Sequence, residues 1–278
     1  MSLSRHHRWR SFCRWLILFT LAVTTGYADE SAPPPAPKPL PNRMPLVVGV
    51  TTDSFPYGYV DNAGRQTGFS ADLLTALARV MNLPIVRVAL PGKELHNRFR
   101  AGEFDFLQAF SQTPDRERYA EFSVPFLTLQ GTIFVQKKGS TIQTLSDFNG
   151  RKFAIIGAGS IAEKFLRDNH LNVIPVFVSS SDEALHLVDS GDCAGAFVSH
   201  LTALSVIEHS HIRNVAIFGE PLPDYDIRHC YAVHRGDAAL LARLNEGLAI
   251  LHSTGEYDRI YRQWFGRFNS PLINREQV

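Results

Sequence analysis

The chain has 278 residues, of which 45% are hydrophobic and 20% charged, with a formal net charge of +1. This composition is that of an ordinary globular protein and excludes a collagen-like or wholly disordered chain. The near-neutral charge argues against a nucleic-acid-binding protein, because such proteins carry a basic patch or stripe. Three cysteines are too few for a disulfide scaffold. The length suffices for about two domains or lobes with a real core.

The first 28 residues have the three parts of a secretory signal peptide. Residues 1–14 contain four arginines and no acidic residue, residues 15–23 are mostly apolar, and the small residues Gly26 and Ala28 suit signal-peptidase cleavage. The apolar run is shorter than the roughly 20 residues that span a bilayer. We therefore predict export to the periplasm with removal of residues 1–28; the alternative is that they remain as an uncleaved anchor.

Removal of this segment changes the charge, because it leaves 24 basic and 27 acidic residues and a net charge of −3. Cys193 and Cys230 remain, and we interpret them as unpaired buried thiols, although export would allow them to form a disulfide.

Residues 29–45 follow the predicted signal peptide, with seven prolines between positions 31 and 45. This density of proline predicts an extended linker rather than a helix or a central strand.

From residue 46 onward, short apolar runs alternate with helical patterns. The first series predicts strands at 46–50, 85–88, 104–109 and 131–135. It also predicts a helix from an N-cap at Ser70 through Met81, and another at 94–100 that Gly102 ends.

The second series begins after a connector at residues 137–140. It predicts strands at 153–156, 173–178, 196–198, 215–218 and 231–233, and helices near 161–169, 182–189 and 200–208. A leucine stripe from Leu240 to Leu251 predicts a long helix, and a last helix runs through Ile260 and Trp264. This alternation predicts an α/β protein with mainly parallel sheets, whose ligand would bind at the carboxyl ends of strands.

The segment after the strand at 104–109 carries a candidate carboxylate ligand. Thr113 is suited to cap a short helix with Pro114 at its first position, which places Arg116 one turn in. A guanidinium there can bind a carboxylate through two parallel hydrogen bonds. The alternative is an exposed arginine paired with Glu117 or Glu121.

The strand at 153–156 leads into a glycine-rich turn, residues 157–162, which opens a helix. The turn matches a dinucleotide-binding pattern, with Asp182 about 20 residues further on. Export away from the main nicotinamide pool argues against that use. We favour an anion held by the helix N-terminus over a plain glycine turn and over a nicotinamide enzyme.

Other chemistry-bearing patterns are sparse. Phe55 and Tyr57, in the loop after the first strand, would either wall a small-ligand pocket or pack into the core. The histidines and cysteines lack zinc spacing, and no Gly-x-Ser-x-Gly elbow is present. We expect no metal, no cofactor and no catalytic residues.

Several segments together resemble the family 3 periplasmic solute-binding proteins. These are Gly68–Leu74 (GFSADLL), Ala101–Asp105 (AGEFD), Thr113–Arg116 (TPDR), Phe122–Phe126 (FSVPF), Leu145–Gly150 (LSDFNG) and the turn at 157–160. The resemblance covers residues 46–270. The final run, Gly255–Gly266, is similar to the end of such domains where they serve as sensors of signalling proteins.

The resemblance implies a type 2 periplasmic-binding-protein fold of two lobes that close on a ligand like a Venus flytrap. The first lobe would comprise residues 46–136 and a return segment, 229–270. The second lobe would comprise residues 137–228, and residues 271–278 would form a C-terminal tail. The ligand cleft would lie between the lobes.

The resemblance also implies the ligand-binding residues. Arg116 takes the position that grips an α-carboxylate, with Ser111 beside it. Gly159 and Ser160 take the anion-contacting turn of the second lobe, and Asp53 and Phe55 lie near the first ligand-facing loop.

Two departures from the family pattern bear on the ligand. Ser199 and His200 stand where an acid would pair with an α-ammonium group, unless Asp224 or Asp226 takes over that role. Because an unpaired buried ammonium is costly, this favours an organic acid or another solute that is not a plain α-amino acid. Residues 91–93 lack the aromatic that often covers the ligand.

We therefore expect a monomeric, non-enzymatic protein that captures a small carboxylate-bearing solute, amino-acid-like or an organic acid. Its partner would be a membrane permease of an ABC transporter or a membrane-bound sensor protein. The alternative implied by the resemblance is a periplasmic cyclohexadienyl dehydratase, which acts on prephenate or arogenate. That enzyme needs an acid in the second lobe, where Ser199, His200 and Thr202 stand.

Overall fold

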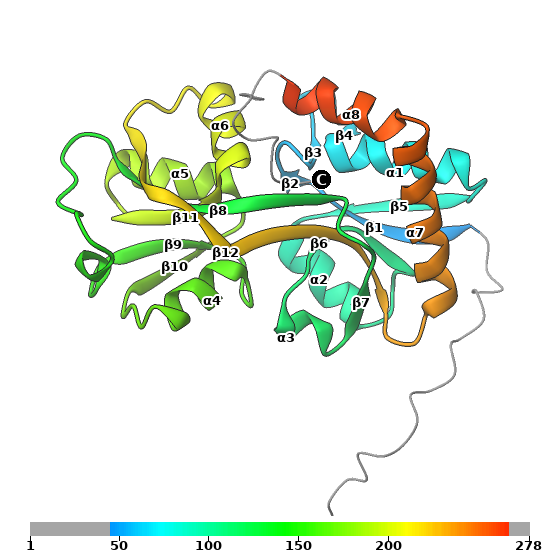
Figure 1. The fold of residues 1–278 in the computed structure, drawn as a ribbon, viewed down its shortest axis with the longest axis horizontal. Helices are drawn as coiled ribbons and strands as arrows, with labels where there is room; N and C mark the ends of the chain where they lie inside the picture. The colour runs from blue at the N-terminus through cyan, green and yellow to red at the C-terminus, as the bar shows by residue number, and fades with distance from the viewer. Residues whose placement is uncertain (1–44, 267–278) are drawn as a thin grey trace, which may run out of the picture. The chain divides into compact units, whose positions relative to one another are not determined.

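A computed structural model describes residues 45–266 (Figure 1). The predicted signal peptide (1–28), nearly all of the predicted linker (29–45) and the C-terminal tail (271–278) lie outside the described residues. Within the described residues, no helix is both long and apolar enough to cross a membrane.

One mixed sheet runs through the described part of the chain, in the order β10-β9-β11-β8-β12-β6-β1-β5, with β7 paired to β12. Its strands are β1 (Leu46–Thr51), β5 (Ile85–Leu90), β6 (Phe106–Ser111), β7 (Ala120–Phe122), β8 (Leu127–Gln136), β9 (Lys152–Ile156), β10 (Ile174–Val178), β11 (Gly195–Ser199) and β12 (Val215–His234). A small second sheet holds β2 (Asp53–Ser54), β3 (Gly58–Val60) and β4 (Gln66–Thr67).

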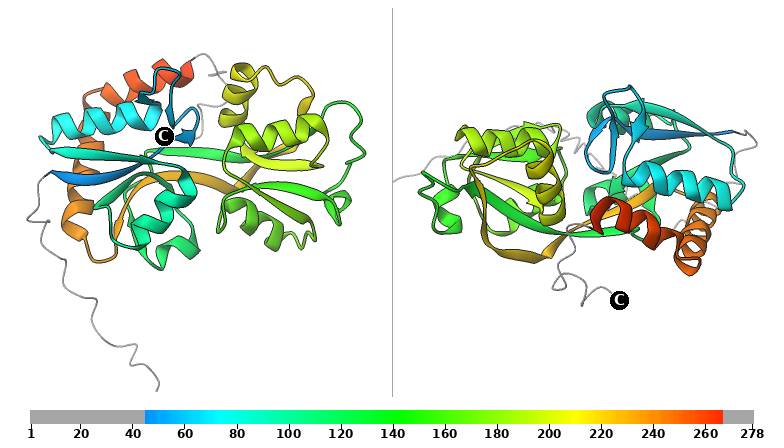
Figure 2. Two further views of the ribbon diagram at one scale, coloured as in Figure 1. Left: turned by 180° about the vertical axis from the view of Figure 1, so that it is seen from behind. Right: turned by 90° about the horizontal axis from the view of Figure 1, so that it is seen from above.

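The helices cover both faces of the large sheet (Figures 1 and 2). They are α1 (Phe69–Val80), α2 (Gly92–Arg100), α3 (Pro114–Glu117), α4 (Ile161–Asp168), α5 (Ser181–Ser190), α6 (His200–His209), α7 (Ala238–Ser253) and α8 (Glu256–Phe265), with a 3₁₀ turn η1 at Leu145–Phe148. The α/β architecture predicted from the alternation of apolar runs and helical patterns is therefore confirmed.

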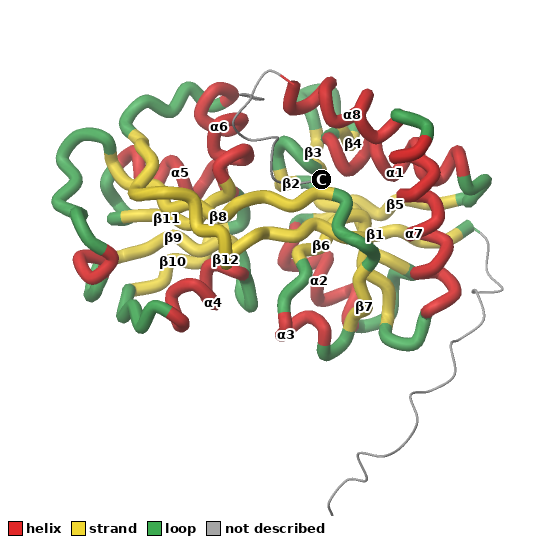
Figure 3. The backbone as a smooth tube through the Cα atoms, in the orientation of Figure 1, coloured by secondary structure: helices red, strands yellow, loops and turns green. Residues whose placement is uncertain are grey.

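The expectation of mainly parallel sheets is only partly correct. The pairs β1–β5, β1–β6, β9–β10 and β9–β11 are parallel, whereas β8 and β12 run antiparallel to their neighbours. The reason is that β8 and β12 lie side by side as long strands joining the two parallel groups (Figure 3).

Strand β12 is a single strand of 20 residues where the sequence predicts two short ones. Pro221 and Pro223 interrupt its apolar pattern and argue against a central strand. The pairing of β12 with β8 continues past them, with register shifts between Phe218 and Leu222 and between Leu222 and Ile227.

Two helix starts illustrate how local chemistry sets the elements. Thr113 caps α3 as predicted, because its side chain accepts a hydrogen bond from the backbone N–H of Arg116. The prediction that Ser70 caps α1 is wrong. The cap is Gly68, at φ 124°, and Ser70 lies inside the helix with a buried hydroxyl that has no partner among the described residues.

The buried residues form two groups of clusters. One group surrounds β1, α1, α2, α7 and α8, and includes Leu46, Leu73 and Leu248; we refer to it as the first lobe. The other surrounds β9, β11, α4, α5 and α6, and includes Phe153 and Val198; we refer to it as the second lobe. The crossing points expected between residues 136 and 137 and between 228 and 229 fall at the end of β8 and inside β12.

Cys193 and Cys230 are both buried free thiols.

Candidate functional site

Arg116 occupies a buried position at the carboxyl end of β6. The Thr113 cap and Pro114 start α3 directly after the strand, and this turn directs the arginine side chain back toward it. The Nη1 atom donates a hydrogen bond of 2.8 Å to the carbonyl oxygen of Ser111, and the guanidinium lies 4.3 Å from the ring centre of Phe110. The residue is only 7% exposed.

The guanidinium of Arg116 has no acidic partner among the described residues: no carboxylate oxygen there lies within 4 Å of it. Glu117 accepts instead from the side-chain amide of Gln112, and Glu121 accepts from the backbone N–H of Gly236. The alternative of an exposed Arg116 paired with Glu117 or Glu121 is therefore wrong. Burial lowers the pKa of Arg116 to about 10, and it stays protonated at neutral pH.

Two histidines that sequence reasoning missed lie next to Arg116. His229 of β12 is the ladder partner of Ser111, and its ring lies 4.8 Å from that of Tyr57. His96 of α2 places its ring 4.5 Å from that of Phe110. Burial, and secondly the charge of Arg116, lowers the pKa of each histidine to about 4. No local sequence pattern marks either residue, because their place beside Arg116 depends on the β6–β12 register and on the packing of α2 against Phe110.

The glycine-rich turn of the second lobe comes close to α3. Gly159 has a φ of 65°, and a Cβ added to it would lie 3.9 Å from the Cβ of Asp115. Its backbone N–H donates to the carboxylate of Glu163, one turn into α4. Glu163 therefore occupies the backbone N–H of Gly159, which we expected to bind an anion of the ligand. Ser160 is the N-cap residue of α4, but its hydroxyl caps nothing and is buried without a partner among the described residues.

Ser199 ends β11 and caps α6. Its hydroxyl accepts from the backbone N–H of Thr202 and is hydrogen-bonded to the Thr202 hydroxyl. The Thr202 hydroxyl in turn lies 2.6 Å from the hydroxyl of Tyr57, in the first lobe. Ser199, which stands where the resemblance implies an acid, is thus part of a buried row of three neutral hydroxyls.

Asp53, in β2, and Phe55, directly after β2, contact different parts of the molecule. The Asp53 carboxylate accepts from the Thr51 hydroxyl at 2.6 Å and from the backbone N–H of Gly92 at 3.2 Å, so it holds the start of α2 within the first lobe. The ring of Phe55 stacks at 4.4 Å on that of His209, at the end of α6. Phe55 therefore contacts the second lobe, whereas Asp53 is engaged in its own.

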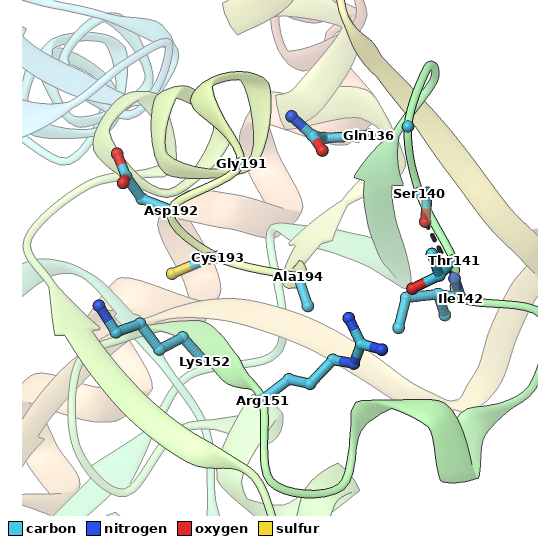
Figure 4. Close-up of a pocket in the computed structure, with 11 residues that line it drawn as sticks. Gln136, Ser140, Thr141, Ile142, Arg151, Lys152, Gly191, Asp192, Cys193 and Ala194 are labelled. Carbon is cyan, nitrogen blue, oxygen red and sulfur yellow. Dashed lines mark hydrogen bonds between the residues drawn. The ribbon is translucent and has the colours of Figure 1, made fainter.

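A pocket of about 300 Å³ lies away from these residues, in the second lobe (Figure 4). It is lined by residues from the end of β8 and the loop after it, the start of β9, and the turn before β11. None of the site residues predicted from the sequence lines it. Among the described residues, no group of three or more His, Cys, Asp or Glu side chains could hold a metal ion.

Replacement of Tyr57 by Phe tests the hydroxyl row. The substitution removes the hydrogen bond to Thr202 while keeping the ring against His229 and Phe265. We expect a loss of about 1 kcal/mol in the free energy of unfolding, measured by urea denaturation. Tyr59→Phe removes a half-buried hydroxyl outside this row and should leave stability within about 0.5 kcal/mol of the parent. Equal stability of the two variants would contradict a contribution from the Tyr57–Thr202 bond.

The fold and the site define a class: a two-lobed binding protein of the type 2 periplasmic architecture. The profile of the bacterial extracellular solute-binding proteins, family 3, matches residues 46–267. The chain belongs to this family.

Individual relatives agree with this assignment. A probable histidine-binding protein of Neisseria gonorrhoeae is 25% identical over 262 residues, covering 89% of this chain and 91% of that protein. A histidine kinase sensor domain with similarity to periplasmic binding proteins has a TM-score of 0.73 and 30% identity, covering 81% of this chain and 97% of that one. An ancestral amino acid-binding protein, a precursor of cyclohexadienyl dehydratase, has a TM-score of 0.68 and 25% identity, covering 79% of this chain and 95% of that one.

Proposed function

We propose that the protein captures a small carboxylate-bearing solute between its two lobes and that Arg116 binds the carboxylate. The observation that carries this proposal is a buried guanidinium with no acidic partner among the described residues. A buried charge is costly unless it is paired, and functional sites are where such a cost is retained.

The geometry of Arg116 suits a ligand better than a structural role. Its single hydrogen bond to the Ser111 carbonyl and its contact with Phe110 hold the guanidinium in place. The remaining N–H groups are available for two parallel hydrogen bonds to a carboxylate. The second lobe would complete the site with the turn at Gly159 and Ser160, where a buried hydroxyl lacks a partner among the described residues.

Three polar residues bear on the nature of the solute. Glu163, the second-lobe acid that acts on Arg116, is held by the backbone N–H of Gly159. Ser199 offers a hydroxyl already engaged with Thr202, not an acid for an ammonium group. Asp226, on β12, has a pKa raised by burial, and the charges acting on it are those of Arg228 and Asp224, not a group of the site. We therefore favour an organic acid, or an amino-acid-like solute whose ammonium group is not bound by an acid of α6.

The place of action follows from the family and the predicted leader. After export to the periplasm and removal of residues 1–28, the protein would act as a monomer. It would deliver its solute to a membrane permease of an ABC transporter, or report the bound state to a membrane-bound sensor protein. The similarity to amino-acid-binding proteins supports the first partner, and that to a kinase sensor domain supports the second.

A thermal-shift screen tests the proposal. Amino acids, keto acids, dicarboxylates and aromatic acids would each be added to the purified protein. A solute that binds only the folded state stabilises it by about 2.7 kcal/mol at a hundredfold excess over its dissociation constant. We expect a clear rise in melting temperature with at least one carboxylate and none with the matching amide. A screen in which no carboxylate raises the melting temperature would contradict the proposal.

A second candidate function is a cyclohexadienyl dehydratase-like activity, favoured by the similarity to a precursor of that enzyme. Against it, the second-lobe position that would hold an acid carries Ser199, which is buried as a helix cap. Incubation with prephenate distinguishes the two functions. Formation of the product's absorbance band would favour the enzyme, and binding without turnover would favour the solute-binding protein.

A further inference from the structure

Two imidazoles and one guanidinium gather at the carboxyl end of β6. His229 is the ladder partner of Ser111, whose carbonyl oxygen accepts the hydrogen bond from Arg116. The ring of His96 packs against the ring of Phe110, over which the guanidinium also lies. Three side chains able to carry positive charge, from β12, α2 and α3, thus lie near the same strand end, with His229 against Tyr57 and His96 against Phe110.

The surroundings of these imidazoles leave their ring nitrogens available. Both histidines are half-buried, and among the described residues neither side chain is hydrogen-bonded. Among the described residues, Arg116 is the one charged group that shifts the pKa of either histidine. The acid and the phenol that act on Arg116 itself are Glu163, held by the N–H of Gly159, and Tyr119.

We propose that the solute carries two acidic groups, one bound by Arg116 and the second hydrogen-bonded by His96 and His229. This inference rests on the proposed function and narrows its substrate class to small dicarboxylates. The site presents one fixed positive charge and two imidazoles that can donate hydrogen bonds. The hydroxyls of Ser199, Thr202 and Tyr57, where the two lobes meet, are neutral and do not neutralise an ammonium group. Glu163, the second-lobe acid that acts on Arg116, is already held by the backbone N–H of Gly159.

A second carboxylate would also change the protonation of the histidines. Without a ligand, burial and Arg116 hold the pKa of each at about 4, so both rings are neutral at pH 7. A nearby anion favours the charged imidazolium and raises its pKa. Binding of a dicarboxylate is therefore coupled to proton uptake. Affinity rises as the pH falls through the raised pKa toward the ligand-free value of about 4, by up to about tenfold per pH unit for each proton taken up.

Calorimetry with succinate and butyrate tests this inference, because the two acids share a four-carbon chain and differ in the second carboxylate. Titrations at about pH 8 and about pH 6.5 keep the carboxylates of both probes mainly ionised. Buffers of different ionisation enthalpy report the protons taken up. We expect succinate to bind at least about tenfold more tightly than butyrate, and more tightly at the lower pH, while the affinity for butyrate changes little.

The variants His96→Gln and His229→Gln keep a hydrogen-bonding side chain that cannot become charged. We expect each to reduce the preference for succinate and the proton uptake while butyrate binding is retained. His186→Gln, on the exposed face of α5, is the matched control and should behave like the parent.

The outcomes separate this inference from the proposed function. Equal affinity for succinate and butyrate would overturn the dicarboxylate inference and leave the carboxylate site at Arg116 intact. A succinate preference that survives both histidine substitutions would overturn the assignment of the second carboxylate to His96 and His229. Failure of every carboxylate in the screen would overturn the proposed function itself.

Discussion

Replacement of Arg116 by alanine is expected to weaken binding of the carboxylate solute by about 100-fold or more. Removal of one partner of a buried, hydrogen-bonded charge pair costs 2 to 5 kcal/mol or more, and about 1.4 kcal/mol corresponds to a factor of ten. The fold should be retained, because the guanidinium makes one internal hydrogen bond and no ion pair among the described residues. Isothermal calorimetry measures the affinity, and thermal melting without solute measures the stability.

Arg118→Ala is the matched control for this variant. Arg118 is the residue directly after α3, two positions beyond Arg116. Its side chain is 82% exposed, with an ion pair to Asp115 at 3.8 Å. Such an exposed pair contributes little. We expect the control to bind the solute like the parent, and an equal loss of affinity in both variants would contradict a specific role for Arg116.

Replacement of Gly68 by alanine is expected to be the most destabilising of the changes considered, by about 3 kcal/mol or more. A Cβ at this position would lie 2.2 Å from the carbonyl oxygen and 2.5 Å from the carbonyl carbon of Tyr57. These atoms belong to the backbone, so a side-chain rotation cannot relieve the clash. The φ of 124° adds strain, because this region of the backbone map is nearly restricted to glycine.

The consequence reaches the site, since the displaced backbone carries Tyr57 and its hydrogen bond to Thr202. Gly64→Ala is the control, at a nearby turn with a φ of 75° and open space around the added atom. It should cost about 1 kcal/mol. Urea denaturation of both variants measures the difference, and a Gly68→Ala protein as stable as Gly64→Ala would show that the chain does not require this close approach.

The sequence predicts the elements of this fold well where a local signal exists. The Thr113–Pro114 pair favours a helix start through its own local chemistry, and the structure has Arg116 where that start implies. Ser70 fails as a cap because the backbone of Tyr57 packs against Gly68 and sets the helix start through a contact absent from local sequence. The two prolines in the middle of β12 lead the sequence to predict two strands. The structure has one strand, because pairing with β8 outweighs the prolines.

The candidate site is predictable in part for the same reason. Ser111 and Ser199 end strands and the turn at Gly159 follows one, and strand ends can be read from apolar runs. His96 and His229 were missed because their relation to Arg116 depends on the register between β6 and β12 and on how α2 packs against Phe110. The engagement of Asp53 with the start of α2 likewise arises from a contact between distant segments.

A structure of the protein with the solute that stabilises it most tests the central claim directly, namely that Arg116 binds a ligand carboxylate. We expect both carboxylate oxygens to lie about 2.7 to 2.9 Å from nitrogen atoms of the Arg116 guanidinium, with the turn at Gly159 and Ser160 facing the same ligand. A solute bound with its carboxylate away from Arg116, for example in the second-lobe pocket beside Arg151 and Lys152, would contradict it.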